Sequence, residues 1–242
     1  KKDFFSNNII YAKTVSLTEQ GCLNIVQFTY ELEHWVDFER QDYWDIIPKS
    51  SGCFKKNKTV EVLLLNGLSQ KKLETIKIGI RKNFARGKNS IHSADDKLEL
   101  IRLATGLFND DFMAFLNHAD TRKFKIVDRI TEKFNVVEDI DNYLFTGSVP
   151  LALYGIRDCR DWDHFFNGSE KMNPYQEEDH SNQLKFYDPE SINFFSNDKN
   201  TLNFRGIRFL SLSSVYLMKK NRRTEKDLRD LKLIETQSLV AL

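Results

Sequence analysis

Two short motifs of this chain, separated by about a dozen residues, have the residue types that handle phosphates and divalent metals. Gly147 and Ser148 form a pair whose backbone N–H groups and hydroxyl suit phosphate oxygens at a helix N-terminus. Asp161 and Asp163, two positions apart, point the same way if they lie on an extended strand. Paired carboxylates are hard oxygen ligands that Mg²⁺ takes together with substrate phosphates. The spacing therefore indicates handling of a nucleoside triphosphate.

The sequence around these motifs resembles a known superfamily. A Gly-Ser pair, a spacer of about a dozen residues and then Asp-x-Asp is similar to the signature of the nucleotidyltransferases with the DNA polymerase β-like catalytic fold. The stretches Leu-Tyr-Gly-Ile-Arg-Asp (153–158) and Arg-Asp-Trp-Asp (160–163) look like bacterial members. So does the tail, with Lys-Lys-Asn-Arg-Arg (219–223) and Glu-Lys-Asp-Leu-Arg-Asp-Leu (225–231). The resemblance covers residues 122–235, and similar domains also occur in bacterial surface-polysaccharide proteins.

This resemblance implies a transferase that depends on Mg²⁺ or Mn²⁺, with Asp161 and Asp163 as metal ligands and catalytic residues. In the superfamily, a third acidic residue on a later strand activates the acceptor hydroxyl. Asp188 is the best placed candidate because it ends a predicted strand, residues 183–187, and Glu190 is the second choice. Pro189 follows Asp188, so Asp188 alternatively starts a turn. Without a third acid, the domain binds nucleotide without turning it over.

Basic side chains near the motifs are candidate nucleotide ligands, together with Gly147 and Ser148. Arg157 and Arg160 flank the aspartates and can contact phosphates bidentately, or alternatively pair with neighbouring aspartates to hold the turn. We expect Lys219 to bind the triphosphate, although charges at a helix junction often only complement the helix dipole. The densest basic patch has five members: Lys219, Lys220, Arg222, Arg223 and Lys226.

Two other functions fit the same residues. The first is a glycosyl- or phosphosugar transferase that uses Asp161-Trp162-Asp163 to hold a nucleotide-sugar diphosphate through a metal. The second is a non-catalytic accessory module of a larger protein. A nucleotide-sugar would bind better than a free nucleoside triphosphate in the first case, and neither would bind in the second.

Composition narrows the class of protein. The 242 residues include 36 Lys and Arg against 35 Asp and Glu, so net charge gives no argument for nucleic acid or a membrane as partner. The most concentrated apolar run, residues 62–65, is far too short to span a bilayer. Three scattered cysteines, Cys22, Cys53 and Cys159, favour a reduced cytoplasmic protein over a disulfide framework or zinc site. Because the first residue is Lys1, we expect a fragment of a longer polypeptide with further domains missing.

The periodicity of apolar residues predicts an α/β (α+β) chain with two domains. Residues 1–120 are expected to form a small α/β domain of unknown role. Residues 121–242 are expected to form the nucleotidyltransferase-like domain, whose mixed sheet carries Asp161 and Asp163 and has flanking helices. The expected strands are 8–17, 60–65, 183–187 and a hairpin at 203–212. The expected helices are 18–37, 69–84, 97–108, 111–117, 122–134, one that Ser213 or Ser214 caps and that runs through Met218, and 225–236, with a loop at 41–58.

Overall fold

The computed structural model describes residues 5, 7–55, 57–135, 140–168, 173–188, 195 and 198–237. The chain divides into two compact units, Lys1–Phe108 and Asn109–Leu242. The division falls before helix α5 (Asp110–His118), which the sequence analysis assigned to the first domain. Asn109 explains the earlier boundary, because its side chain caps α5 and its amide donates to the carbonyl oxygen of Thr201, 3.2 Å away in the second unit.

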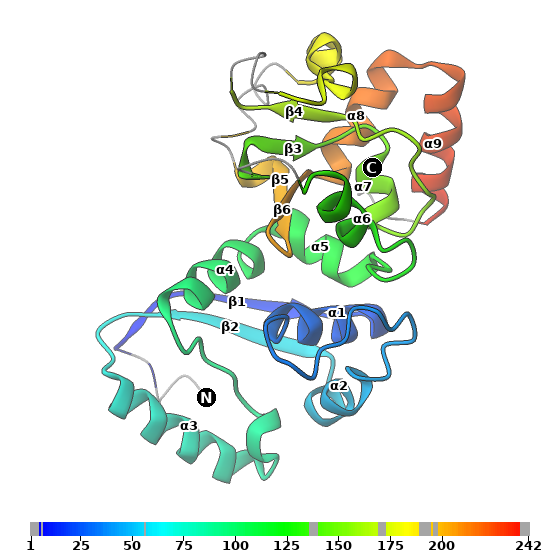
Figure 1. The fold of residues 1–242 in the computed structure, drawn as a ribbon. Helices are drawn as coiled ribbons and strands as arrows, with labels where there is room; N and C mark the ends of the chain where they lie inside the picture. Colours follow the sequence, from blue (N-terminus) through cyan, green and yellow to red (C-terminus); the bar gives the residue numbers. More distant parts are fainter. Residues whose placement is uncertain are drawn as a thin grey trace. The chain divides into compact units, whose positions relative to one another are not determined.

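The first unit is built on a two-stranded antiparallel sheet of β1 (Ile9–Ser16) and β2 (Thr59–Leu65), which confirms both predicted strands. In Figure 1 this sheet lies between the helices α4 and α3. In the sequence, helices lie both between the two strands and after β2. The helices of this unit are α1 (Glu19–Thr29), α2 (Ile47–Phe54), α3 (Gln70–Phe84) and α4 (Lys97–Leu107).

Side-chain caps fix where these helices begin. The hydroxyls of Thr18 and Ser69 and the carboxylate of Asp96 each accept a hydrogen bond from a backbone N–H in the first turn. Two expectations for this unit are wrong. Helix α1 ends at Thr29 rather than near residue 37, and the stretch expected to be a loop contains α2.

The second unit contains a mixed four-stranded sheet, so the chain is α+β as predicted. The strand order is β4-β3-β6-β5, in which β3 and β6 are parallel and the other pairs are antiparallel. The hairpin β5–β6 turns at Arg205 and Gly206, which confirms the hairpin expected about Gly206. The strands are β3 (Tyr143–Phe145), β4 (His164–Phe166), β5 (Thr201–Phe204) and β6 (Ile207–Leu210).

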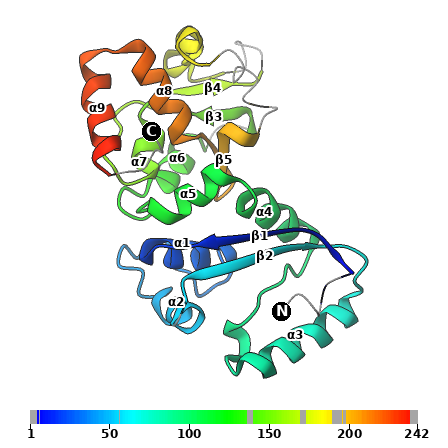
Figure 2. The ribbon, with the colours of Figure 1, turned by 180° about the vertical axis from the view of Figure 1, so that it is seen from behind.

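Helices surround this sheet and carry much of the core. Helices α8 and α9 pack against each other, and both ribbon views show them side by side (Figures 1 and 2). The helices of this unit, besides α5, are α6 (Ile126–Lys133), α7 (Val149–Leu153), α8 (Leu212–Arg222) and α9 (Glu225–Thr236). Across the described ranges, no helix combines the length and the apolar character needed to cross a membrane. Cys22, Cys53 and Cys159 are free thiols.

Candidate functional site

The Gly147-Ser148 pair lies where strand β3 ends and helix α7 begins. All three residues of β3 are buried, and Thr146 connects the strand to Gly147, whose φ is +61°. Ser148 is the N-cap residue of α7 and is 2% exposed. Its hydroxyl oxygen is buried and has no hydrogen-bond partner among the described residues. A buried hydroxyl of this kind can accept or donate a hydrogen bond to a bound molecule.

Asp163 packs directly on the Gly147 turn. The backbone N–H of Thr146 donates to the carbonyl oxygen of Asp163 over 2.8 Å, which continues the antiparallel pairing of β3 with β4. A Cβ atom on Gly147 would overlap the Asp163 carboxylate, so only glycine leaves room for it. The chain between the two motifs therefore folds back and brings Gly147 and Asp163 into contact.

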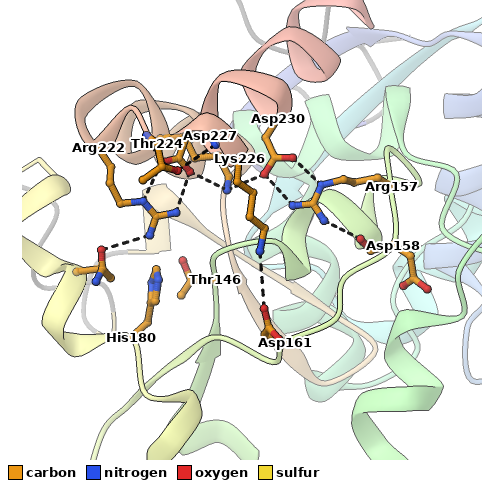
Figure 3. A network of polar contacts seen from close by, with 12 residues as sticks. Thr146, Arg157, Asp158, Asp161, His180, Arg222, Thr224, Lys226, Asp227 and Asp230 are labelled. Carbon is orange, nitrogen blue, oxygen red and sulfur yellow. Dashed lines mark hydrogen bonds and ion pairs between the residues drawn. The ribbon is translucent and has the colours of Figure 1, made fainter.

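Asp161 lies apart from that contact. Strand β4 begins at His164, so the two aspartates precede the strand instead of lying on it as the sequence analysis expected. The Asp161 side chain is 61% exposed, and its carboxylate lies 3.7 Å from the Nζ of Lys226 at the start of α9 (Figure 3). The cation that stands beside Asp161 is thus Lys226.

The acid expected on a later strand has a different setting. Residues 183–187 form no strand, because Ser181–Phe186 is a 3-10 helix, so that prediction is wrong. Asp188 follows it and is exposed. Its neighbour Tyr187 is buried, and the Tyr187 hydroxyl is 2.7 Å from the hydroxyl of Thr146, which holds this segment beside the Gly147 turn. Glu190, the second choice, lies outside the described residues.

The basic candidates from the sequence have three different environments. Arg157 makes a bidentate pair with Asp230, at 2.6 and 2.7 Å. Lys219 is 1% exposed, and its Nζ lies 2.9 Å from Asp230 and 3.5 Å from Asp227. Arg160 is exposed. The structure thus corrects the role expected for Lys219, because its ammonium group is buried and neutralised by two carboxylates. Arg157 pairs with a distant aspartate, Asp230, and not with Asp161.

A buried ion network joins α8, α9 and the loop after α7 (Figure 3). Burial by itself would raise the pKa of Asp227, but hydrogen bonds from Arg222 and Thr224 outweigh it and hold the pKa well below its ordinary value. Burial likewise opposes ionisation of Asp230, and the Arg157 guanidinium and Lys219 lower its pKa. Both aspartates therefore stay ionised at neutral pH and fix α9 against α8.

Three polar side chains that the sequence analysis did not single out, Thr146, His180 and Tyr187, gather with Arg222 next to Asp163. Figure 3 shows Thr146, His180 and Arg222 close to one another, and His180 Nδ1 is 3.5 Å from the Tyr187 hydroxyl. Burial lowers the pKa of His180 while the Asp163 carboxylate opposes that change, which keeps the imidazole neutral near pH 7. No motif in the sequence marks these residues, because segments remote in sequence bring them together.

The donor chemistry of the two aspartates suits a hard divalent cation. Asp161 and Asp163 supply carboxylate oxygens on either side of Trp162, and Mg²⁺ in nucleotide sites is bound by one or two carboxylates plus substrate phosphates. No cluster of three or more His, Cys, Asp or Glu side chains suited to a metal occurs within the described residues. Within that part of the chain, no third acidic side chain joins Asp161 and Asp163 in a metal-sized cluster.

A scan of protein-family models, a search of curated proteins and a search of solved structures each found no match for this chain.

Proposed function

We propose that the second unit is a Mg²⁺-dependent nucleotidyltransferase, which moves a nucleoside monophosphate from a nucleoside triphosphate to a hydroxyl or phosphate acceptor. The observation that carries this proposal is the contact of the Asp163 carboxylate with the Gly147 turn. A metal-binding acid and a phosphate-binding turn serve one substrate only if they are adjacent. The resemblance of residues 122–235 to nucleotidyltransferases supports the same reaction.

In this proposal each described residue has a limited task. Asp161 and Asp163 hold the metal ion, which when bound neutralises triphosphate charge and stabilises the attacking and leaving oxygens. The Gly147 backbone and the unpartnered Ser148 hydroxyl bind phosphate oxygens. Lys226, which stands beside Asp161, supplies a cation at the outer side of the triphosphate. These interactions align the α-phosphate with the acceptor.

The remaining task in the proposed reaction is the activation of the acceptor hydroxyl. Asp188 remains our candidate, because its neighbour Tyr187 is hydrogen-bonded to Thr146, the residue before Gly147. The resemblance to domains of bacterial surface-polysaccharide proteins favours a sugar or sugar-phosphate acceptor in the cytoplasm.

The test is a thermal-melting titration of the full chain with each nucleoside triphosphate and with UDP-, GDP- and CDP-sugars, in the presence and absence of Mg²⁺. Asp163→Asn removes the proposed metal ligand, and Glu132→Gln, on an exposed position of α6, is the matched control. A ligand present at 100 times its Kd stabilises the folded state by about 2.7 kcal/mol, which is easily measured. Pyrophosphate release in the presence of sugar acceptors then measures transfer.

We expect a Mg²⁺-dependent shift with one triphosphate that Asp163→Asn abolishes and Glu132→Gln retains. A shift with nucleotide-sugars alone would instead identify a metal-dependent glycosyl- or phosphosugar transferase. If the folded protein melts in a single transition and no ligand shifts its melting temperature, the proposal is overturned and an accessory module is favoured.

A further inference from the structure

The first unit has a partly open cavity of about 770 Å³. Its walls come from α1, α2, β2, α3, α4 and residues 86–94, all within Lys1–Phe108. The space lies between β2 and α3, two elements that both ribbon views show apart from each other (Figures 1 and 2). Sites for small molecules have volumes of roughly 300–1,000 Å³ and mainly apolar walls, so this cavity is large enough for a ligand.

The described residues cover the apolar wall of the cavity only in part. Every residue of β2, Thr59–Leu65, is only half-buried, although the sequence of this strand is that of a core element. Leu100 of α4 and Phe84 of α3 also line the space and are 45% and 42% exposed. Apolar side chains without neighbours lose dispersion contacts, so a molecule with an apolar body would gain those contacts on entering.

One end of the cavity is positively charged. Arg86 lines it and donates to the carbonyl oxygen of Cys53 over 3.2 Å, which places its guanidinium at the end of α2. Lys88 lines the same end, and the Nζ of Lys49 donates to the Lys88 carbonyl oxygen over 3.2 Å. The acidic side chain among the described wall residues is Glu61 on β2. The two basic side chains of the wall, Arg86 and Lys88, attract an anionic group to this end, and Lys49 lies next to it.

The wall also contains an unused polar group. The Ser93 hydroxyl lines the cavity, is buried, and has no hydrogen-bond partner among the described residues. His92, its neighbour in the wall, is already paired with Glu99 at 2.8 Å. A buried hydroxyl without a partner is costly unless another molecule satisfies it.

We propose that this cavity binds an amphipathic anion, a molecule with one hydrocarbon chain and a phosphate or carboxylate head. The chain lies along β2 between α3 and α4, and the head lies at the end formed by Arg86 and Lys88. The first unit is thereby a ligand-binding module in its own right, with a site independent of Asp163.

Three probes that share one chain length test the proposal: decyl phosphate, 1-decanol and decyltrimethylammonium, with decanoate as a second anion to separate the two head groups. Binding to the full chain is measured by isothermal titration calorimetry below the concentration at which the probes form micelles. We expect one molecule of decyl phosphate per chain, bound about tenfold more tightly than decanol, with decyltrimethylammonium weakest.

Two variants locate the site. Ala104→Phe adds an aromatic ring to the α4 wall and should weaken decyl phosphate at least tenfold by filling the space. Lys88→Gln, at an exposed side chain that is safe for folding, should reduce the preference for decyl phosphate over decanol several-fold. Lys72→Gln, on an exposed position of α3 that does not line the cavity, should change neither value.

The proposal fails if the phosphate and ammonium probes bind equally, if many molecules bind per chain, or if Ala104→Phe folds and binds decyl phosphate like wild type. The Asp163→Asn variant should bind decyl phosphate normally. Loss of nucleotide binding in that variant therefore leaves the two proposals distinguishable.

Discussion

The carboxylate of Asp163 occupies the space that a side chain at position 147 would need. Position 147 therefore requires glycine for two reasons. The first is this lack of space, and the second is a φ of +61°, which lies in the left-handed region that other residues adopt only at a cost. The same contact joins the two motifs that the sequence places about a dozen residues apart.

Gly147→Ala should destabilise the fold by about 2–4 kcal/mol, because backbone strain adds to the overlap with Asp163. Gly206→Ala is the matched control, since Gly206 has a φ of +76° but nothing within 4 Å of its missing side chain. That variant should lose about 1 kcal/mol, from strain alone. Urea unfolding of both variants measures the difference. Equal losses would show that Asp163 moves aside freely.

Lys219→Met should reduce the free energy of unfolding by about 3 kcal/mol, because it leaves Asp227 and Asp230 buried with one cation fewer. The loss is at the lower end for a broken buried pair because Arg222 and Arg157 remain. Lys232→Met, at an exposed position of α9, should cost less than about 0.5 kcal/mol. Chemical denaturation tests both, and a Lys219→Met protein of normal stability would contradict the buried network.

Acid should destabilise the second unit in a defined range. The pKa values of Asp227 and Asp230 lie below the ordinary 3.8, so the unfolded chain binds more protons than the folded one as the pH falls. Their stabilisation is complete above about pH 5 and decreases progressively below it. Arg157→Met should make this decrease shallower, since it removes a group that lowers the pKa of Asp230. Arg229→Met, which breaks an exposed pair with Glu225, should leave the slope unchanged in urea unfolding from pH 2 to 7.

Lys226→Met separates two effects of the cation beside Asp161. Its exposed ion pair should contribute less than about 1 kcal/mol to stability. If Asp161 holds the metal, Mg²⁺ alone should bind the variant more tightly, because Lys226 no longer competes for the carboxylate. The triphosphate should bind more weakly by several-fold, because a phosphate partner is lost. Titration calorimetry measures both, and changes of the same sign would contradict the arrangement.

The sequence was sufficient where local signals agree with tertiary packing. Ser69 begins a helix, residues 60–65 form a strand and Gly206 turns a hairpin, because capping and turn residues act over three or four positions. The contact between Gly147 and Asp163 was anticipated only as a motif spacing. Its geometry depends on how β3 pairs with β4.

Long-range effects explain the errors. Lys219 lies in a basic stretch of a kind that is usually exposed to solvent. Its burial is favourable because Asp227 and Asp230, in the following helix α9, neutralise its charge. Residues 183–187 alternate like a strand, but residues 181–186 form a 3-10 helix. Tyr187 follows this helix, and its hydroxyl is hydrogen-bonded to the hydroxyl of Thr146. Neither partnership is visible in a window of neighbouring residues.

The parallel pairing of β3 with β6 also has a consequence during synthesis. Leu144 is paired with Arg208, and the helix, the second strand and the hairpin arm between them must all emerge before that pair can form. Non-local strand pairing of this kind slows folding, because loop closure precedes the contacts that reward it. Until β6 arrives, β3 and the Gly147 turn have an open strand edge. A nascent chain of this protein is therefore most exposed to edge-to-edge pairing before β6 is complete, while α8 and α9 are still to be made.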